Sequence, residues 1–235
     1  MEKKKRIWEL DVIRGIAIIG VVFIHVVYDL NYVFGVHVDF GPVFDFVQVY
    51  GSLIFIILSG ICITLGRHHI KRGLIVFGGG VAVSLVTVVM AELKLIHSNS
   101  VIHFGVLSLL GLSMILYIPF KKVNKYFVLF FGVVFVVMGL IFNSVKVENP
   151  YLFPLGLTTK YYSSGDYFPI FPNFGYFLIG SFLGRTVYKN KKTLLPFISD
   201  RNIVVRFFSF LGRQSLWIYL AHQPVAYVVL SIIFS

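Results

Sequence analysis

The sequence predicts an all-α protein, a polytopic transmembrane helix bundle of about seven spans. Of its 235 residues, 57% are hydrophobic and only 13% are charged, and the mean hydropathy is +0.87. Soluble domains usually contain about a quarter charged residues. The single cysteine, Cys62, excludes an intrachain disulfide. We interpret residues 1–235 as a single transmembrane domain.

A bilayer-spanning helix needs about 20 mostly apolar residues. A basic N-terminus followed by an apolar run could belong to a signal peptide, but no cleavage site of small residues follows, so we expect the first span to be retained. The last span is interrupted by Arg213 and Pro224, and we expect it to cross after Arg213. The expected spans lie roughly at 12–30, 46–66, 73–92, 103–120, 126–144, 168–186 and 208–234.

Lysine and arginine positions predict the orientation, because cytoplasmic loops are rich in these residues. With the N-terminus in the cytoplasm and about seven spans, the C-terminus lies outside, and 18 of the 21 basic residues lie inside. Only Lys94, Lys146 and Lys160 fall outside. This distribution explains the net charge of +11 without a nucleic-acid partner.

The first span, "LDVIRGIAIIGVVFIHVVYDL", carries Asp11, Arg14, His25 and Asp29 on one face. At 1.5 Å and about 100° per residue, His25 lies about 16 Å beyond Arg14 on the same side of the helix. A charged side chain at bilayer depth costs about 2.5–3.5 kcal/mol, so we expect this face to line the protein interior. Asp29 is placed to orient His25 as a general base. The alternatives are a neutral His25 bonded to a neighbouring helix and an Arg14 that extends to the interface.

Four further residues are candidates for a site. His222, nine residues after Arg213, precedes Pro224, which leaves the carbonyl of Leu220 without its helical donor. His103 opens the fourth span, where an interfacial histidine is the alternative. Asp166 precedes the sixth span and is equally typical of a helix N-terminus. Arg67, in "GRHHIKRG", belongs to a basic turn that suits either phosphates or anionic lipid.

Four blocks carry a family resemblance: "RIWELDVIRGIAIIGVVFIHVVYDL", "VIHFGVLSLLGLSMIL", "DYFPIFPNFGYFLIGSFLGR" and "FLGRQSLWIYLAHQPV". In this order they resemble the bacterial branch of the heparan-α-glucosaminide N-acetyltransferase catalytic-domain family, along nearly the whole chain. The spacing of Arg14 and His25 is similar, more distantly, to the arginine–histidine motif of acyltransferase-3 membrane enzymes, which acetylate cell-surface sugars.

The resemblance implies an acyltransferase of the bacterial plasma membrane. Acetyl-CoA would be its cytoplasmic co-substrate and a sugar or glycan amine or hydroxyl its acceptor, with no permanently bound cofactor and no metal. His25 would act as base or acetyl carrier with Asp29 and His222 as its catalytic partners. Arg14, Asp11, His103, Asp166, Arg213 and Arg67 would bind the substrates.

Two other functions are consistent with the same residues. A proton-coupled transporter would use the polar face of the first span as its path, with His25 and Asp29 as a proton relay. A structural or lipid-binding membrane protein would need these residues only for stability. The sequence leaves the oligomeric state and the acceptor open.

Overall fold

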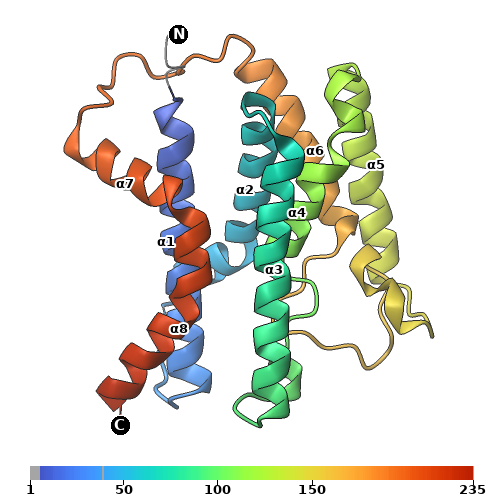
Figure 1. Ribbon diagram of the computed structural model, residues 1–235, viewed down its shortest axis with the longest axis vertical. Coiled ribbons are helices and arrows are strands. Elements are labelled where there is room, and N and C mark those ends of the chain that lie inside the picture. Colours follow the sequence, from blue (N-terminus) through green and yellow to red (C-terminus); the bar gives the residue numbers. More distant parts are fainter. Residues whose placement is uncertain (1–5, 39, 235) are drawn as a thin grey trace. The chain divides into compact units, whose positions relative to one another are not determined.

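The computed structural model describes residues 6–38 and 40–234 (Figure 1). Over these residues the regular structure is helical, and the only β-type pairings are isolated bridges, Phe104 with Tyr167 and Lys146 with Thr158. The predicted all-α class is therefore confirmed. The α-helices are α1 (Trp8–Tyr32), α2 (Pro42–Leu65), α3 (His69–Glu92), α4 (Val106–Leu116), α5 (Lys125–Asn143), α6 (Ile170–Val187), α7 (Ile203–Arg213) and α8 (Ser215–Phe234).

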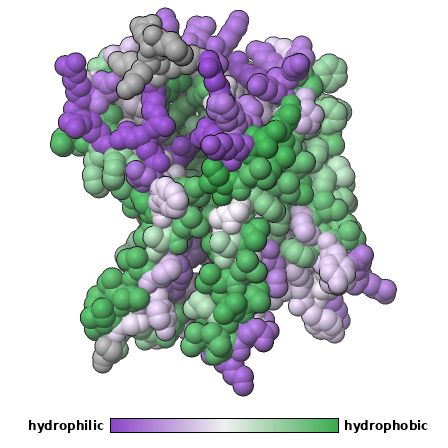
Figure 2. Space-filling model, viewed as in Figure 1, coloured by the Kyte–Doolittle hydropathy of each residue, from purple (hydrophilic) through white to green (hydrophobic). Residues whose placement is uncertain are grey.

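Five helices are long and apolar enough to cross a membrane: α1, α2, α3, α5 and α8. Apolar side chains cover much of the exposed surface along the helices, and hydrophilic ones gather toward helix ends (Figure 2). These helices match the expected spans at 12–30, 46–66, 73–92 and 126–144, and the final part of the last expected span. The prediction of a helical membrane protein is thus supported.

The remaining expected spans differ from the helices in the structure. Residues 103–120 are α-helical only over α4, whose 11 residues reach about 16 Å. Segment 168–186 contains α6, which is kinked because the backbone of Phe171 is non-helical. Segment 208–234 is divided at Gln214 into α7 and α8. The count of about seven spans and the orientation of the termini stay predictions.

The chain forms two compact units, Met1–Phe55 with Tyr188–Ser235 and Ile56–Val187. In the first unit α7 runs obliquely across the first part of α1, and α8 runs beside the later part of α1 (Figure 1). The α1–α7 backbones touch: a Cβ on Gly15 would overlap the carbonyl oxygen of Phe208, and one on Gly212 would overlap that of Asp11. Glycine at both positions therefore permits the crossing.

In the second unit, α3 packs on α4 and α5 packs on α6. Its core contains the buried rings of Tyr117, Phe174 and Phe177. Arg185, near the end of α6, donates to the hydroxyl of Tyr117 at 2.6 Å and to the carbonyl oxygens of Phe120 and Val123, each at 2.7 Å. Arg185 therefore joins α6 to the turn that follows α4.

Replacing Arg185 by Met should lower stability by about 2–4 kcal/mol, because the buried Tyr117 hydroxyl and two carbonyl groups lose a charged donor. The measurement is the midpoint of thermal unfolding in detergent, followed by size-exclusion chromatography. Lys189→Met, an exposed cation one helical turn further on, is the matched control and should unfold like the wild type. Equal midpoints for the two variants would contradict this role of Arg185.

Replacing Gly212 by Val should separate α7 from α1, because the added carbons meet backbone rather than a movable side chain. The free energy of unfolding should fall by about 1–3 kcal/mol. Gly78→Val in α3 is the control, since no atom lies within 4 Å of a Cβ added there. The same thermal assay compares the two variants. A Gly212→Val protein as stable as Gly78→Val would show that the close α1–α7 approach is not required.

Candidate functional site

Two histidines from distant parts of the chain meet where α1 contacts α8. The ring centroids of His25 and His222 lie 4.8 Å apart, with the ring planes inclined by 55°. Both side chains are partly buried. We expected His222 to act with His25, and the structure brings the two rings into contact.

The hydrogen bonding of His222 defines its tautomer. Its Nδ1 lies at hydrogen-bond distance from the carbonyl oxygen of Tyr219, one turn earlier in α8. A carbonyl only accepts, so Nδ1 carries the hydrogen and donates it, and Nε2 keeps its lone pair. That Nε2 is buried and has no hydrogen-bond partner among the described residues. His222 thus presents an unused, buried basic nitrogen.

Asp29 contacts α8 through a different residue from the one expected. Its side chain is 2% exposed, and the amide nitrogen of Gln223 donates to both carboxylate oxygens, at 2.9 and 3.0 Å. The expected hydrogen bond from His25 to Asp29 is not formed among the described residues. The two oxygens of one carboxylate lie so close together that a single N–H of the amide is shared between them.

Gln223 was not among the predicted residues, although the sequence contains a feature that could have identified it. It follows His222 in "AHQP", and a polar amide inside an apolar span carries the same information as the histidine beside it. Its side-chain oxygen is buried and lacks a partner within the described chain. Gln223 and His222 therefore each leave one acceptor atom unused on neighbouring residues of α8.

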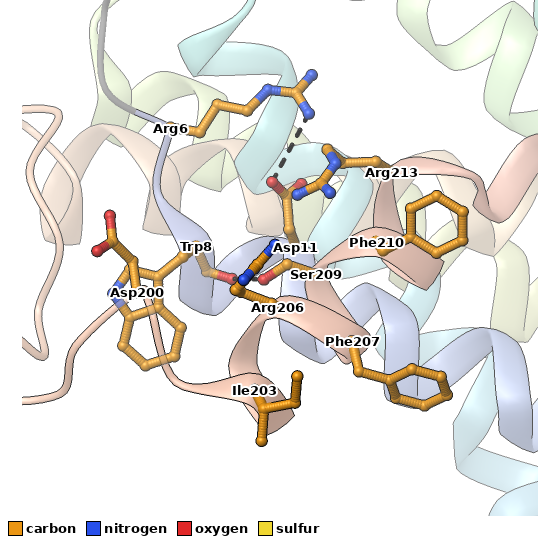
Figure 3. A pocket seen from close by; sticks show the side chains of 10 residues that line it. All are labelled: Arg6, Trp8, Asp11, Asp200, Ile203, Arg206, Phe207, Ser209, Phe210 and Arg213. Carbon is orange, nitrogen blue, oxygen red and sulfur yellow. Dashed lines mark hydrogen bonds and ion pairs between the residues drawn. The ribbon is translucent and has the colours of Figure 1, made fainter.

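At the start of α1 the predicted inner residues lie close together. Asp11 pairs with Arg14 at 4.0 Å and with Arg6 at 3.8 Å. Asp11 and Arg213 line a cavity of about 620 Å³, which Figure 3 shows with the guanidinium of Arg213 beside the carboxylate of Asp11. The polar face predicted on α1 is therefore the face that packs on α7 and α8.

Glu9 is a further polar residue of α1 that the sequence analysis missed. It is 5% exposed and accepts from the hydroxyl of Thr193 and the backbone N–H of Leu194, both at 2.8 Å. These bonds fix the loop before α7. An acid in the first helical turn is common, so no sequence signal set Glu9 apart.

Three predicted residues belong to the second unit. Asp166 accepts from the backbone N–H of Val106 at 3.1 Å and so caps α4, not the helix that follows Asp166 in sequence. His103 is exposed, and its ring lies about 6 Å from those of Phe153 and Tyr162. Arg67 is exposed in the turn between α2 and α3.

The aromatic residues near His103 include two tyrosines whose hydroxyls are held in the protonated form. Burial raises the pKa of Tyr162 to about 12. Burial, with Tyr162 alongside, also raises the pKa of Tyr167. The Tyr167 hydroxyl donates to the carbonyl oxygen of Phe153 at 2.6 Å. At neutral pH both hydroxyls therefore keep their hydrogen.

No group of three or more histidine, cysteine, aspartate or glutamate side chains gathers as a metal site within the part of the chain that the structure describes. The chemistry of the α1–α8 contact consists of two imidazoles, one carboxylate and one amide.

Comparison with known proteins adds the family. A family model described as heparan-alpha-glucosaminide N-acetyltransferase, catalytic, matches residues 6–224. No curated protein and no solved structure matches the chain. The more distant resemblance to acyltransferase-3 enzymes is not shown by these comparisons. A match over nearly the whole sequence shows that this chain belongs to the heparan-alpha-glucosaminide N-acetyltransferase catalytic family.

Proposed function

We propose that the protein is a membrane-embedded acyltransferase that moves an acetyl group from cytoplasmic acetyl-CoA to an amine or hydroxyl of a cell-surface sugar or glycan. Membership of the family supports a membrane acetyltransferase. The observation that carries the proposal is the contact of His25 with His222, whose Nε2 is buried and unused. An imidazole with a free lone pair can serve as a general base or as a nucleophile.

The proposal includes the orientation predicted from the basic residues. The N-terminus and the start of α1 lie in the cytoplasm of a bacterium, and about seven crossings of the plasma membrane bring the C-terminus outside. Donor and acceptor are then on opposite sides, and the acetyl group passes through the protein near His25 and His222.

The geometry serves two chemical routes. In direct transfer, a histidine Nε2 takes the proton from the acceptor amine or hydroxyl as that atom attacks the thioester carbonyl carbon. The C–S bond breaks, and the coenzyme A thiolate leaves and receives the proton. In the two-step route, Nε2 itself attacks the carbonyl carbon, the C–S bond breaks and the thiolate leaves. The acceptor then attacks the acetyl carbon, the C–N bond to Nε2 breaks, and the proton of the acceptor neutralises the thiolate. The nucleophile attacks the same thioester carbon in both routes.

The inner arginines would attract the donor. Acetyl-CoA carries several phosphate charges, and Arg14 and Arg213 supply a positive field near the start of α1. Arg67, in the basic turn between α2 and α3, is expected on the same side of the membrane and would add to this attraction. Arg14 lies 11 residues before His25, about 16 Å along α1. An extended pantetheine arm bridges such a separation and would bring the thioester to the histidines. Asp11 would hold Arg14 in place through their ion pair.

The acceptor would be bound through His103 and its aromatic neighbours. His103 is exposed next to Phe153 and Tyr162, and aromatic faces with hydroxyl and imidazole groups suit a sugar ring. Asp166 would contribute by fixing the start of α4, two residues beyond Phe104.

The function is tested with the full-length protein in liposomes. Radiolabelled acetyl-CoA is supplied on the side of the N-terminus, and glucosamine is enclosed on the other side. Label should appear on the enclosed amine with the wild type. His222→Gln should lower the initial rate by about 10²–10⁴-fold, because the variant lacks the base. His25→Gln should lower it in the same range if the two rings act together.

His97→Gln is the matched control, since His97 is exposed in the loop after α3 and should leave the rate unchanged. A wild-type protein that neither binds acetyl-CoA nor transfers label to an amine or hydroxyl sugar would overturn the proposal. Proton-dependent uptake of a solute, lost in His25→Gln without any acetyl transfer, would identify a transporter instead.

The hydrogen bonds between Gln223 and Asp29 should hold α8 in register with α1. Gln223→Leu should destabilise the protein because a buried carboxylate loses its amide donor, and Asp29→Leu because the amide loses its acceptor. The double variant should recover part of the loss, with a coupling of about 1–3 kcal/mol in thermal unfolding. Strictly additive losses would show that the two side chains are not coupled.

A further inference from the structure

Helix α7 presents an apolar face that the described chain leaves uncovered. The exposed fractions of Ile203, Phe207 and Phe210 are 76%, 56% and 51%. On the other side of α7, Ser209 and Gly212 are buried against α1. At about 100° per residue, the apolar residues form one face and the buried residues another. The apolar face therefore points away from α1.

The position of α7 in the chain indicates what covers this face. The helix ends at Arg213, and α8, which is long and apolar enough to span a membrane, begins at Ser215. With 11 residues, α7 reaches about 16 Å and is too short to cross. A strongly amphipathic helix directly before a span is typical of a helix that lies in the membrane interface. Lipid is then the natural cover for the apolar face.

Two arginines lie along one edge of this apolar face. Arg206 and Arg213 are seven residues apart and so lie on one side of α7, between the apolar face and the face that packs on α1. Both line the cavity of about 620 Å³, together with Trp8 and the rings of Phe207 and Phe210 (Figure 3). Arg206 forms no hydrogen bond or ion pair with a residue that the structure describes, whereas Arg213 lies beside the carboxylate of Asp11 and interacts with it electrostatically.

The acidic residues of the cavity leave the side formed by α7 positive. Asp11 already pairs with Arg6 and, outside the cavity lining, with Arg14. Asp200 lies beside Trp8, at the opposite side of the view from Arg213 (Figure 3). The cavity thus joins a cationic wall to an apolar face at the expected depth of lipid headgroups.

We propose that this cavity binds the headgroup of an anionic phospholipid. Arg206 holds the phosphate, since a guanidinium donates two parallel hydrogen bonds to phosphate oxygens, while Arg213 stays beside Asp11. The acyl chains lie over Ile203, Phe207 and Phe210. A soluble phosphate would use Arg206 but leave the apolar face bare, so the lipid is the occupant that accounts for both. The proposal does not depend on acyl transfer.

The test uses Trp8, which lines the cavity and is the single tryptophan left after Trp217→Phe. The full-length variant is placed in lipid nanodiscs of phosphatidylcholine with increasing phosphatidylglycerol whose acyl chains are brominated near the headgroup. Quenching of Trp8 fluorescence then gives the relative binding constant of the two lipids. Phosphatidylglycerol should bind several-fold more tightly, and Arg206→Gln should reduce its preference about fivefold.

Arg201→Gln is the matched control, because Arg201 is exposed just before α7 and does not line the cavity. Its preference should equal that of the parent, and both variants should elute and unfold like the parent. Equal quenching by brominated phosphatidylcholine and phosphatidylglycerol would overturn the proposal, as would an equal loss in Arg201→Gln. Relief of quenching by inorganic phosphate, but not by chloride at equal ionic strength, would assign the site to a soluble anion.

Discussion

Polar side chains inside an apolar helix must find partners on a neighbouring helix, and the contact between α1 and α8 follows from this constraint. A carboxylate without donors at bilayer depth costs several kcal/mol. Asp29 meets that requirement with the amide of Gln223, 194 residues away in sequence. Because Gln223 follows His222 directly, the same contact carries the imidazole of His222 to that of His25.

The α1–α8 contact gives its carboxylate an amide donor but leaves two acceptor atoms, His222 Nε2 and Gln223 Oε1, without partners in the described chain. Buried polar atoms normally form hydrogen bonds. Two acceptors without a donor on adjacent residues therefore indicate that a ligand supplies the donor. A substrate that brings a donor, such as the amine or hydroxyl of an acceptor, would supply the missing hydrogen. Stability and proposed chemistry thus use different atoms of the same four side chains.

Much of this arrangement could be predicted from the sequence, because hydropathy and helical spacing are local properties. They predict the helical class and the polar face of α1, but not the break at Gln214 that divides the last expected span. The span predicted at 103–120 was too long, because Pro119 and the turn at Tyr117 end α4 inside an apolar run. The partners of Asp29, Asp166 and Glu9 depend on contacts between distant segments. No spacing within one helix encodes them.

The central claim is that His222 is held with Nδ1 protonated and Nε2 free. Solid-state nitrogen-15 NMR of histidine-labelled protein in lipid vesicles measures this directly, with the His222 signals assigned by their loss in His222→Gln. The account predicts a protonated, pyrrole-type Nδ1 bonded to the Tyr219 carbonyl and an unprotonated, pyridine-type Nε2. A ring protonated at Nε2 and free at Nδ1 would leave no base at the contact with His25 and would contradict the account.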